Sequence, residues 1–136
     1  MKKNILYIDN DIASYILVSA ILEGCNVDII HSRCGLNAIR LFQQYLSIDV
    51  VITELKVPGI DGFGILKEIR KINSNIPVIA QTAHVVNNMK YTCLNAGFNE
   101  FIPKPIDFSD FTSIVNKYTQ SSCVMELEST TSNNLL

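Results

Sequence analysis

The amino-acid sequence predicts an α/β protein built as a three-layer sandwich, with helices on both faces of a parallel sheet. Five short runs rich in apolar residues alternate with five longer segments of helical length or periodicity. Several of the short runs are apolar at consecutive positions, as strands covered on both faces are. Helical crossovers between the strands make the sheet parallel and its connections right-handed.

The expected elements alternate strictly, and 136 residues fit a single domain of ordinary size. The strands are expected at residues 5–8, 26–30, 49–53, 77–81 and 99–102. The helices are expected at residues 12–23, 36–45, 63–71, 87–96 and 107–118.

Length, periodicity and a stop signal predict the helices of the first half. The first helix is a segment of helical length, and Gly24 stands after it where a left-handed C-cap residue belongs. In the second helix Leu36, Ile39 and Phe42 follow one another at three-residue steps. These residues therefore form one apolar face.

The helices of the second half differ in the strength of their patterns. Residues 63–71 place three aliphatic side chains on one face and leave four charged side chains for the other. The helix at residues 87–96 is only weakly amphipathic and closes at Gly97. Asp107 can cap the last helix, which carries an apolar stripe of Phe111, Ile114, Val115 and Tyr118.

Residues 119–136 break this pattern. Serine, threonine and asparagine dominate the segment, with a small apolar island at residues 124–127. We therefore expect one domain at residues 3–118 and a polar C-terminal tail or linker at residues 119–136. An extension of the last helix that docks the apolar island is the alternative.

Composition excludes several classes of protein. The net charge is −2, and no lysine or arginine cluster exceeds the short groups at residues 1–3 and 67–71, so direct nucleic-acid binding is not expected. The longest apolar stretch, near residues 15–22, is too short to span a bilayer, and no secretory signal precedes it. The four cysteines form no metal-binding pattern and are expected to be reduced thiols of a cytoplasmic protein.

Polar residues follow the expected strands at their carboxyl ends, which meet at one rim of a parallel sheet. The first strand leads to Asp9, Asn10 and Asp11, and later strands lead to Glu54, Thr82 and Lys104. Carboxylate oxygens suit Mg²⁺, while a lysine and a hydroxyl suit phosphoryl oxygens. Taken singly, acids at strand ends are commonly solvated, and Thr82 could cap the next helix. Taken together, the set indicates the handling of a phosphoryl group on a carboxylate.

Four motifs, in this order and at these intervals, resemble the receiver domain of bacterial response regulators. They are ILYIDND, VVITELKVPGIDGFGILKEIR, IPVIAQTA and FIPKPID. The resemblance covers about residues 3–118. It implies a flavodoxin-like fold with strand order 2-1-3-4-5, and a role in two-component or phosphorelay signal transduction, in which a histidine kinase passes phosphate to an aspartate.

The resemblance also implies roles for individual residues. Asp9 matches the first residue of the family's metal-holding acid pair, and Lys104 matches the lysine that pairs with the acceptor and its phosphate. Thr82 matches the switch hydroxyl, and Phe101 takes the aromatic switch position. Phe101 could equally be a half-buried aromatic of the core that does not act as a switch.

Two positions depart from the family pattern, so the chain resembles an atypical receiver. Glu54 stands where the phosphate-accepting aspartate is, and Asn10 stands where the second acid usually is. Glutamate places its carboxylate about 1 Å or more from where aspartate would place it, and phosphoryl transfer depends on positioning. An amide in place of an acid leaves Asp9, Asn10 and Glu54 as a weak or absent Mg²⁺ site.

These departures suggest that Glu54 reaches Lys104 directly, without metal and near Thr82. The domain is then not phosphorylated normally and has one fixed conformation. Whether Glu54 mimics the phosphorylated state or locks an inactive one stays open. A carboxylate would mimic only in part, because it carries one charge and a phosphoryl group nearly two.

We expect a signalling module rather than an enzyme, acting through contacts with a histidine kinase or another signalling protein. The resemblance places the contact face, and a homodimer interface, at residues 87–118. No nucleic acid or membrane partner is expected. The alternatives are a conventional phosphorylatable receiver and a small haloacid-dehalogenase-like phosphohydrolase that uses Asp9, although a cap domain and a later acid pair are missing. A flavin or nucleotide carrier would need a glycine-rich loop that the sequence lacks.

Overall fold

The computed structural model describes residues 2–44, 47–86 and 88–123. Its five strands form one parallel sheet in the order β2-β1-β3-β4-β5, which confirms the predicted fold class and strand order. The strands are β1 (Lys3–Ile8), β2 (Val27–Ser32), β3 (Ile48–Glu54), β4 (Val78–Thr82) and β5 (Glu100–Pro103).

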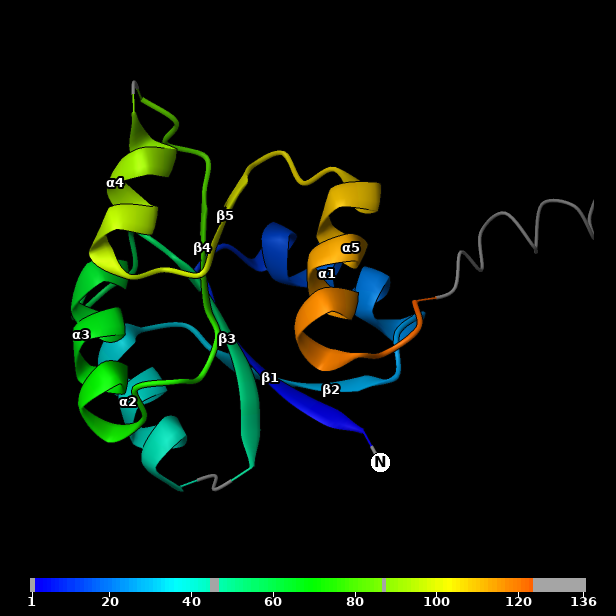
Figure 1. Ribbon diagram of the computed structural model, residues 1–136, viewed down its shortest axis with the longest axis horizontal. Coiled ribbons are helices and arrows are strands. Elements are labelled where there is room, and N and C mark those ends of the chain that lie inside the picture. Colours follow the sequence, from blue (N-terminus) through cyan, green and yellow to red (C-terminus); the bar gives the residue numbers. More distant parts are fainter. Residues whose placement is uncertain (1, 45–46, 87, 124–136) are drawn as a thin grey trace, which may run out of the picture.

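Helices cover both faces of this sheet (Figure 1). Helices α1 and α5 lie on one face, and α2, α3 and α4 lie on the other. Their bounds are α1 (Ile12–Glu23), α2 (Gly35–Gln44), α3 (Gly62–Ile72), α4 (Met89–Ala96) and α5 (Phe108–Thr119). None of these helices is long and apolar enough to cross a membrane.

The sheet divides the core into two clusters of buried side chains. Successive strand residues point to opposite faces, so Leu6 and Ile8 pack toward α2, α3 and α4 while Ile5 and Tyr7 pack toward α1 and α5. Residues two apart in a strand therefore share a face. This alternation also decides on which side of the sheet each side chain at the strand ends lies.

Each helix end lies within two residues of the end predicted from the sequence. Helix α1 has the predicted bounds, with Asp11 as its N-cap, and Asp107 caps α5 by accepting a hydrogen bond from the Asp110 N–H. Gly97 ends α4 in the left-handed conformation, at φ 117°. The expectation for Gly24 was wrong, because this residue has φ −79° and ψ −4° and ends α1 with right-handed geometry.

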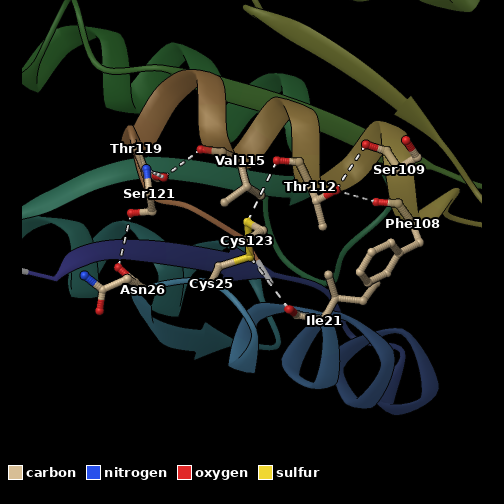
Figure 2. The surroundings of a disulfide bond; sticks show 10 residues. All are labelled: Ile21, Cys25, Asn26, Phe108, Ser109, Thr112, Val115, Thr119, Ser121 and Cys123. Carbon is tan, nitrogen blue, oxygen red and sulfur yellow. Dashed lines mark hydrogen bonds between the residues drawn. A yellow bond between two sulfur atoms is a disulfide. The ribbon is translucent and has the colours of Figure 1, made fainter. Parts of the chain in front are cut away.

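A disulfide joins Cys25, just after α1, to Cys123, just after α5 (Figure 2). The expectation of four reduced thiols was therefore wrong for these two residues, whereas Cys34 and Cys93 are free. Spacing could not reveal a pair separated by 98 residues. The fold brings them together because α1 and α5 lie on the same face of the sheet.

The chain stays against the domain beyond residue 118. Thr119 and Ser121 are buried, and the Ser121 hydroxyl donates to the carbonyl of Asn26 at 3.2 Å. The first residues of the predicted tail thus pack beside the turn that leads into β2. Residues 124–136, which include the apolar island at 124–127, lie outside the described residues.

Candidate functional site

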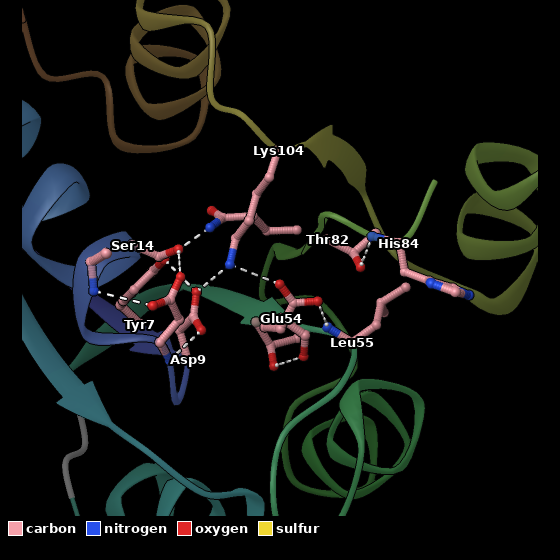
Figure 3. Close-up of polar contacts among 12 residues, drawn as sticks. Tyr7, Asp9, Ser14, Glu54, Leu55, Thr82, His84 and Lys104 are labelled. Atoms are coloured by element: carbon pink, nitrogen blue, oxygen red, sulfur yellow. Dashed lines mark hydrogen bonds and ion pairs between the residues drawn. The ribbon is translucent and has the colours of Figure 1, made fainter. Parts of the chain in front are cut away.

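A cleft of about 400 Å³ opens at the carboxyl end of the sheet, where ligands bind in open parallel sheets. Its lining contains all the polar residues expected at the ends of β1, β3, β4 and β5. Phe101, which was expected as a switch residue, is not part of the lining. The lining residues are Asp9, Asn10, Asp11, Glu54, Lys56, Thr82, Ala83, His84 and Lys104. Figure 3 shows Lys104 reaching down between Asp9 and Glu54.

Asp9 directly follows β1 and is almost completely buried, with 1% of its surface exposed. Its Oδ2 accepts hydrogen bonds from the Lys104 ammonium at 2.7 Å and from the Tyr7 hydroxyl at 2.9 Å. Its Oδ1 accepts the backbone N–H of Asp11 at 2.9 Å. A carboxylate with three donors, one of them charged, is held in one orientation.

Glu54 is the last residue of β3 and is also buried, at 8% exposed. Its Oε2 lies 2.8 Å from Lys104 Nζ, so the direct contact expected from the sequence is present. Its Oε1 accepts the backbone N–H of Leu55 at 3.0 Å. The two oxygens of the Glu54 carboxylate thus contact Lys104 and the backbone of Leu55.

Lys104 follows β5 and is the single cation between two buried anions. Burial alone would lower the pKa of its ammonium group. The hydrogen bonds to Asp9 and Glu54 and the charges of both carboxylates outweigh burial and hold the pKa of Lys104 above its ordinary value. These three side chains, Asp9, Glu54 and Lys104, form what we call the charge triad, with a net charge of −1.

The protein itself supplies donors to the carboxylate oxygens at which a Mg²⁺ ion would bind in the charge triad. Each of the four carboxylate oxygens of Asp9 and Glu54 already accepts a hydrogen bond or ion pair from the protein. Asn10 is exposed, and the described part of the chain contains no group of three histidine, cysteine, aspartate or glutamate side chains arranged to hold a metal. A divalent cation would have to displace protein donors from both acids.

Thr82 shares the cleft but not the contacts of the charge triad. Its Oγ1 accepts the backbone N–H of His84 at 3.0 Å, and no hydrogen bond links it to Glu54 or Lys104 among the described residues. Thr82 stands two positions after Ala80, which packs toward α3 and α4, as the half-buried Phe101 does. Thr82 and Phe101 therefore lie on the face of the sheet opposite the charge triad.

Two polar residues beneath the site were not predicted from the sequence. Tyr7 in β1 and Gln81 in β4 are fully buried beneath the cleft, and Gln81 Nε2 donates to the Tyr7 hydroxyl at 2.8 Å. Burial first, and the charge of Asp9 second, raise the pKa of Tyr7 far above its ordinary value. The available signal was a polar side chain inside each of two otherwise apolar strands.

His31, at the end of β2, also contacts the site. Its ring stacks on that of Tyr15 at a centroid distance of 3.9 Å, and its Nε2 lies 3.0 Å from the Asp9 carbonyl. Because a carbonyl oxygen can only accept, Nε2 carries the hydrogen. The stack therefore ties α1 and β2 to the backbone of Asp9.

Comparisons with known proteins agree with this fold. Residues 5–116 match the response regulator receiver domain family. The sensor protein GacS of Pseudomonas syringae pv. syringae is 29% identical over 120 residues, which are 85% of this chain and 13% of that protein. The chain thus spans only a small part of that relative.

Solved structures give the same result. A response regulator receiver domain protein from Clostridium thermocellum is 29% identical, with a TM-score of 0.78 over 85% of this chain and 93% of that one. In the CheX–CheY–BeF₃–Mg²⁺ complex of Borrelia burgdorferi, the matched chain is 26% identical, with a TM-score of 0.78 over 85% of this chain and 87% of that one. The chain belongs to the response regulator receiver domain family of two-component signal transduction.

Proposed function

We propose that this chain is an atypical receiver that is not normally phosphorylated and that signals through protein–protein contacts. The observation that carries the proposal is the 2.8 Å contact between Glu54 Oε2 and Lys104 Nζ. By the match of motifs, Glu54 stands at the position of the phosphate-accepting aspartate. Lys104 stands at the position of the lysine that pairs with the acceptor and with its phosphate. In this chain the two side chains pair with each other.

The geometry around Glu54 opposes phosphoryl transfer in two ways. The acceptor oxygen must lie in line with the leaving group, and a misplacement of about 1 Å can reduce the rate about 100-fold. Both Glu54 oxygens also already have donors, Lys104 Nζ and the N–H of Leu55. A phosphoryl donor would have to remove Glu54 from Lys104 before it could react.

Magnesium is expected to bind weakly or not at all. Asn10 supplies a neutral amide at the presumed metal position, and the ammonium of Lys104 already neutralises part of the charge on Asp9 and Glu54. Like-charge repulsion between the two acids, which a cation would otherwise relieve, is relieved by the lysine. We therefore propose that the site is complete without metal.

The same contacts favour a single conformation. Glu54 is held toward Lys104, on the face of the sheet that packs against α1 and α5, and it makes no hydrogen bond with Thr82 in the described part of the structure. Its carboxylate pairs with Lys104 rather than with the hydroxyl of Thr82. We propose that Thr82 and Phe101 keep one arrangement irrespective of phosphate.

Output is proposed to pass through the surface at residues 87–118. On α4, Tyr91 and Leu94 are 65% and 41% exposed, and together with Asn88, Lys90 and Asn95 they line a shallow depression. An exposed aromatic and an exposed aliphatic on one helix suit a protein partner or a second copy of the chain. In the Borrelia burgdorferi complex a receiver of this fold is held by CheX, so the fold supports contacts with another protein.

Receiver domains are in general signalling modules rather than enzymes, and we propose the same for this chain, in the cytoplasm. A phosphohydrolase that uses Asp9 as nucleophile is disfavoured, because both oxygens of Asp9 are engaged and 1% of the residue is exposed. In a reducing compartment thiols are kept reduced, so the Cys25–Cys123 disulfide would form there only under oxidising conditions.

Treatment of the wild type and of Glu54→Asp with acetyl phosphate and Mg²⁺, followed by intact mass measurement, tests the proposal. We expect the wild type to gain nothing and Glu54→Asp to gain the mass of one phosphoryl group. A hydroxylamine-labile phosphate on the wild type would show that Glu54 does not block the reaction.

Two further variants make the result specific. Glu54→Asp combined with Asp9→Asn should lose the phosphate again if the gain depends on the acids of the cleft. If Glu54→Asp gains no phosphoryl group, the double variant Asn10→Asp with Glu54→Asp is tested next. Phosphorylation of the double variant would show that Asn10 is a second block, and no phosphorylation would show that these two positions do not account for the loss.

A further inference from the structure

Beneath the charge triad, Tyr7 and Gln81 form a chain of buried polar groups that reaches across the sheet. Tyr7 lies in β1 and Gln81 in β4, with β3 between these strands. Neither side chain is exposed to solvent. The hydrogen bonds run from Gln81 Nε2 to the Tyr7 hydroxyl at 2.8 Å, and from that hydroxyl to Asp9 Oδ2 at 2.9 Å.

The direction of every hydrogen bond in this chain is fixed by Asp9. The Asp11 N–H donates to one oxygen of the Asp9 carboxylate and the Lys104 ammonium to the other, so both oxygens act as acceptors. The Tyr7 hydroxyl must then give its hydrogen to Asp9 and accept one itself. Gln81 must turn its amide nitrogen, not its oxygen, toward Tyr7.

This orientation leaves Gln81 Oε1 buried without a partner among the described residues. The opposite orientation would let Oε1 accept from Tyr7, but Asp9 would then lose a donor. A buried unpartnered carbonyl is unfavourable. Keeping the Tyr7 hydroxyl on Asp9 therefore outweighs this loss.

We propose that Tyr7, oriented by Gln81, is a positioning residue that holds the Asp9 carboxylate inward on Lys104 and so disfavours divalent cations at the site. The inference rests on the proposed metal-free site. With 1% of Asp9 exposed, a cation in the cleft can reach its oxygens only if the carboxylate turns outward. Turning outward breaks the hydrogen bond from Tyr7.

Removal of the Tyr7 hydroxyl should therefore increase the affinity of the site for a divalent cation. Tyr7→Phe keeps the ring in the core and deletes the donor, so the turn of Asp9 no longer breaks a hydrogen bond to a charged group. A hydrogen bond of this kind corresponds to an increase in affinity of about ten-fold or more. A role of Tyr7 in packing alone would leave the affinity unchanged.

The experiment is a calorimetric titration of Mg²⁺ and Mn²⁺ into the full chain, with circular dichroism to verify folding. Tyr15→Phe is the matched control: this half-buried tyrosine lies 6.4 Å from Tyr7 by ring centroids and donates no hydrogen bond within the described ranges. We expect the wild type and Tyr15→Phe to bind both ions equally weakly and Tyr7→Phe to bind about ten-fold more tightly.

A second variant removes the polar environment altogether. Combining Tyr7→Phe with Gln81→Leu leaves Asp9 as the one remaining polar group of this chain of hydrogen bonds. A buried water needs at least two polar partners, so a water in place of the lost hydroxyl is disfavoured and should not restore the donor to Asp9. The double variant should bind the ions at least as tightly as Tyr7→Phe. Affinities within two-fold of the wild type in both folded variants would overturn the inference, as would tight binding by the wild type.

Failure of this inference can be told apart from failure of the proposed function. If the wild type stays unphosphorylated while Tyr7→Phe leaves the ion affinity unchanged, only the role of Tyr7 is wrong. A wild type that accepts phosphate from acetyl phosphate refutes the proposed function whatever the ion titrations show.

Discussion

Replacing Lys104 with methionine should destabilise the domain strongly at neutral pH. Methionine keeps much of the side-chain volume but leaves Asp9 and Glu54 as buried carboxylates without a counter-charge. Their oxygens bind the same nitrogen, so they lie at most about 5.5 Å apart and repel each other by about 3 kcal/mol at an effective dielectric constant of about 20. Breaking a buried ion pair from one side costs about 3–5 kcal/mol. We expect the free energy of unfolding to fall by that amount.

The pH dependence of this loss separates electrostatics from packing. Without Lys104 the charged forms of both acids are disfavoured, so protonation near pH 4 should return much of the lost stability to the variant. In the wild type the pKa of Lys104 is raised on folding. Its contribution is therefore complete below the unfolded pKa of about 10.4 and is lost as the pH rises through the higher folded value.

Urea unfolding followed by circular dichroism, at pH 4 and at pH 7, measures both quantities. Lys56→Met is the matched control, because Lys56 lines the same cleft but is exposed. This variant should stay within about 0.5 kcal/mol of the wild type. The reasoning on the charge triad is refuted if Lys104→Met loses less than about 1 kcal/mol at pH 7, or if its loss is the same at both pH values.

Two further substitutions test the packing of the fold. Cys123→Ser removes a cross-link across 98 residues and should lower the free energy of unfolding in non-reducing buffer by about 4–5 kcal/mol, whereas Cys34→Ser should leave it unchanged. Dithiothreitol should lower the melting temperature of the wild type to that of Cys123→Ser. Equal melting temperatures of the wild type and Cys123→Ser without reductant would contradict this prediction. Gly35→Ala should cost about 1–3 kcal/mol, because its Cβ would overlap the carbonyl of Ile60. Gly64→Ala, where only the Ile60 side chain must move, should cost less in the same thermal melts, and equal losses would refute the reasoning.

The convergence of Asp9, Glu54 and Lys104 could be predicted because it depends on topology alone. The carboxyl ends of parallel strands meet at one edge whatever their register. The strand order itself came from the resemblance of motifs, not from apolar periodicity. Strand ends differed from the predicted ones by at most two residues, since the outermost residues of a strand carry weak patterns.

The contact between Tyr7 and Gln81 could not be predicted, because it depends on the register of two strands that are not neighbours. In the sequence Tyr7 belongs to the apolar run at residues 5–8, and nothing there shows that its hydroxyl reaches Asp9. The position of Thr82 on the opposite face is likewise a matter of register. The Cys25–Cys123 pair needed the path of the chain after α5.

The Cys25–Cys123 disulfide also determines how the domain bears mechanical load. When the chain is pulled between its N-terminal side and the residues after Cys123, tension passes through β1, α1 and the sulfur bridge, and residues 26–122 are outside the loaded path. With the bridge reduced, the same tension runs through α5 and β5, the element that precedes Lys104. The redox state of one cysteine pair thus decides whether a pulling force reaches the candidate site from the side of α5.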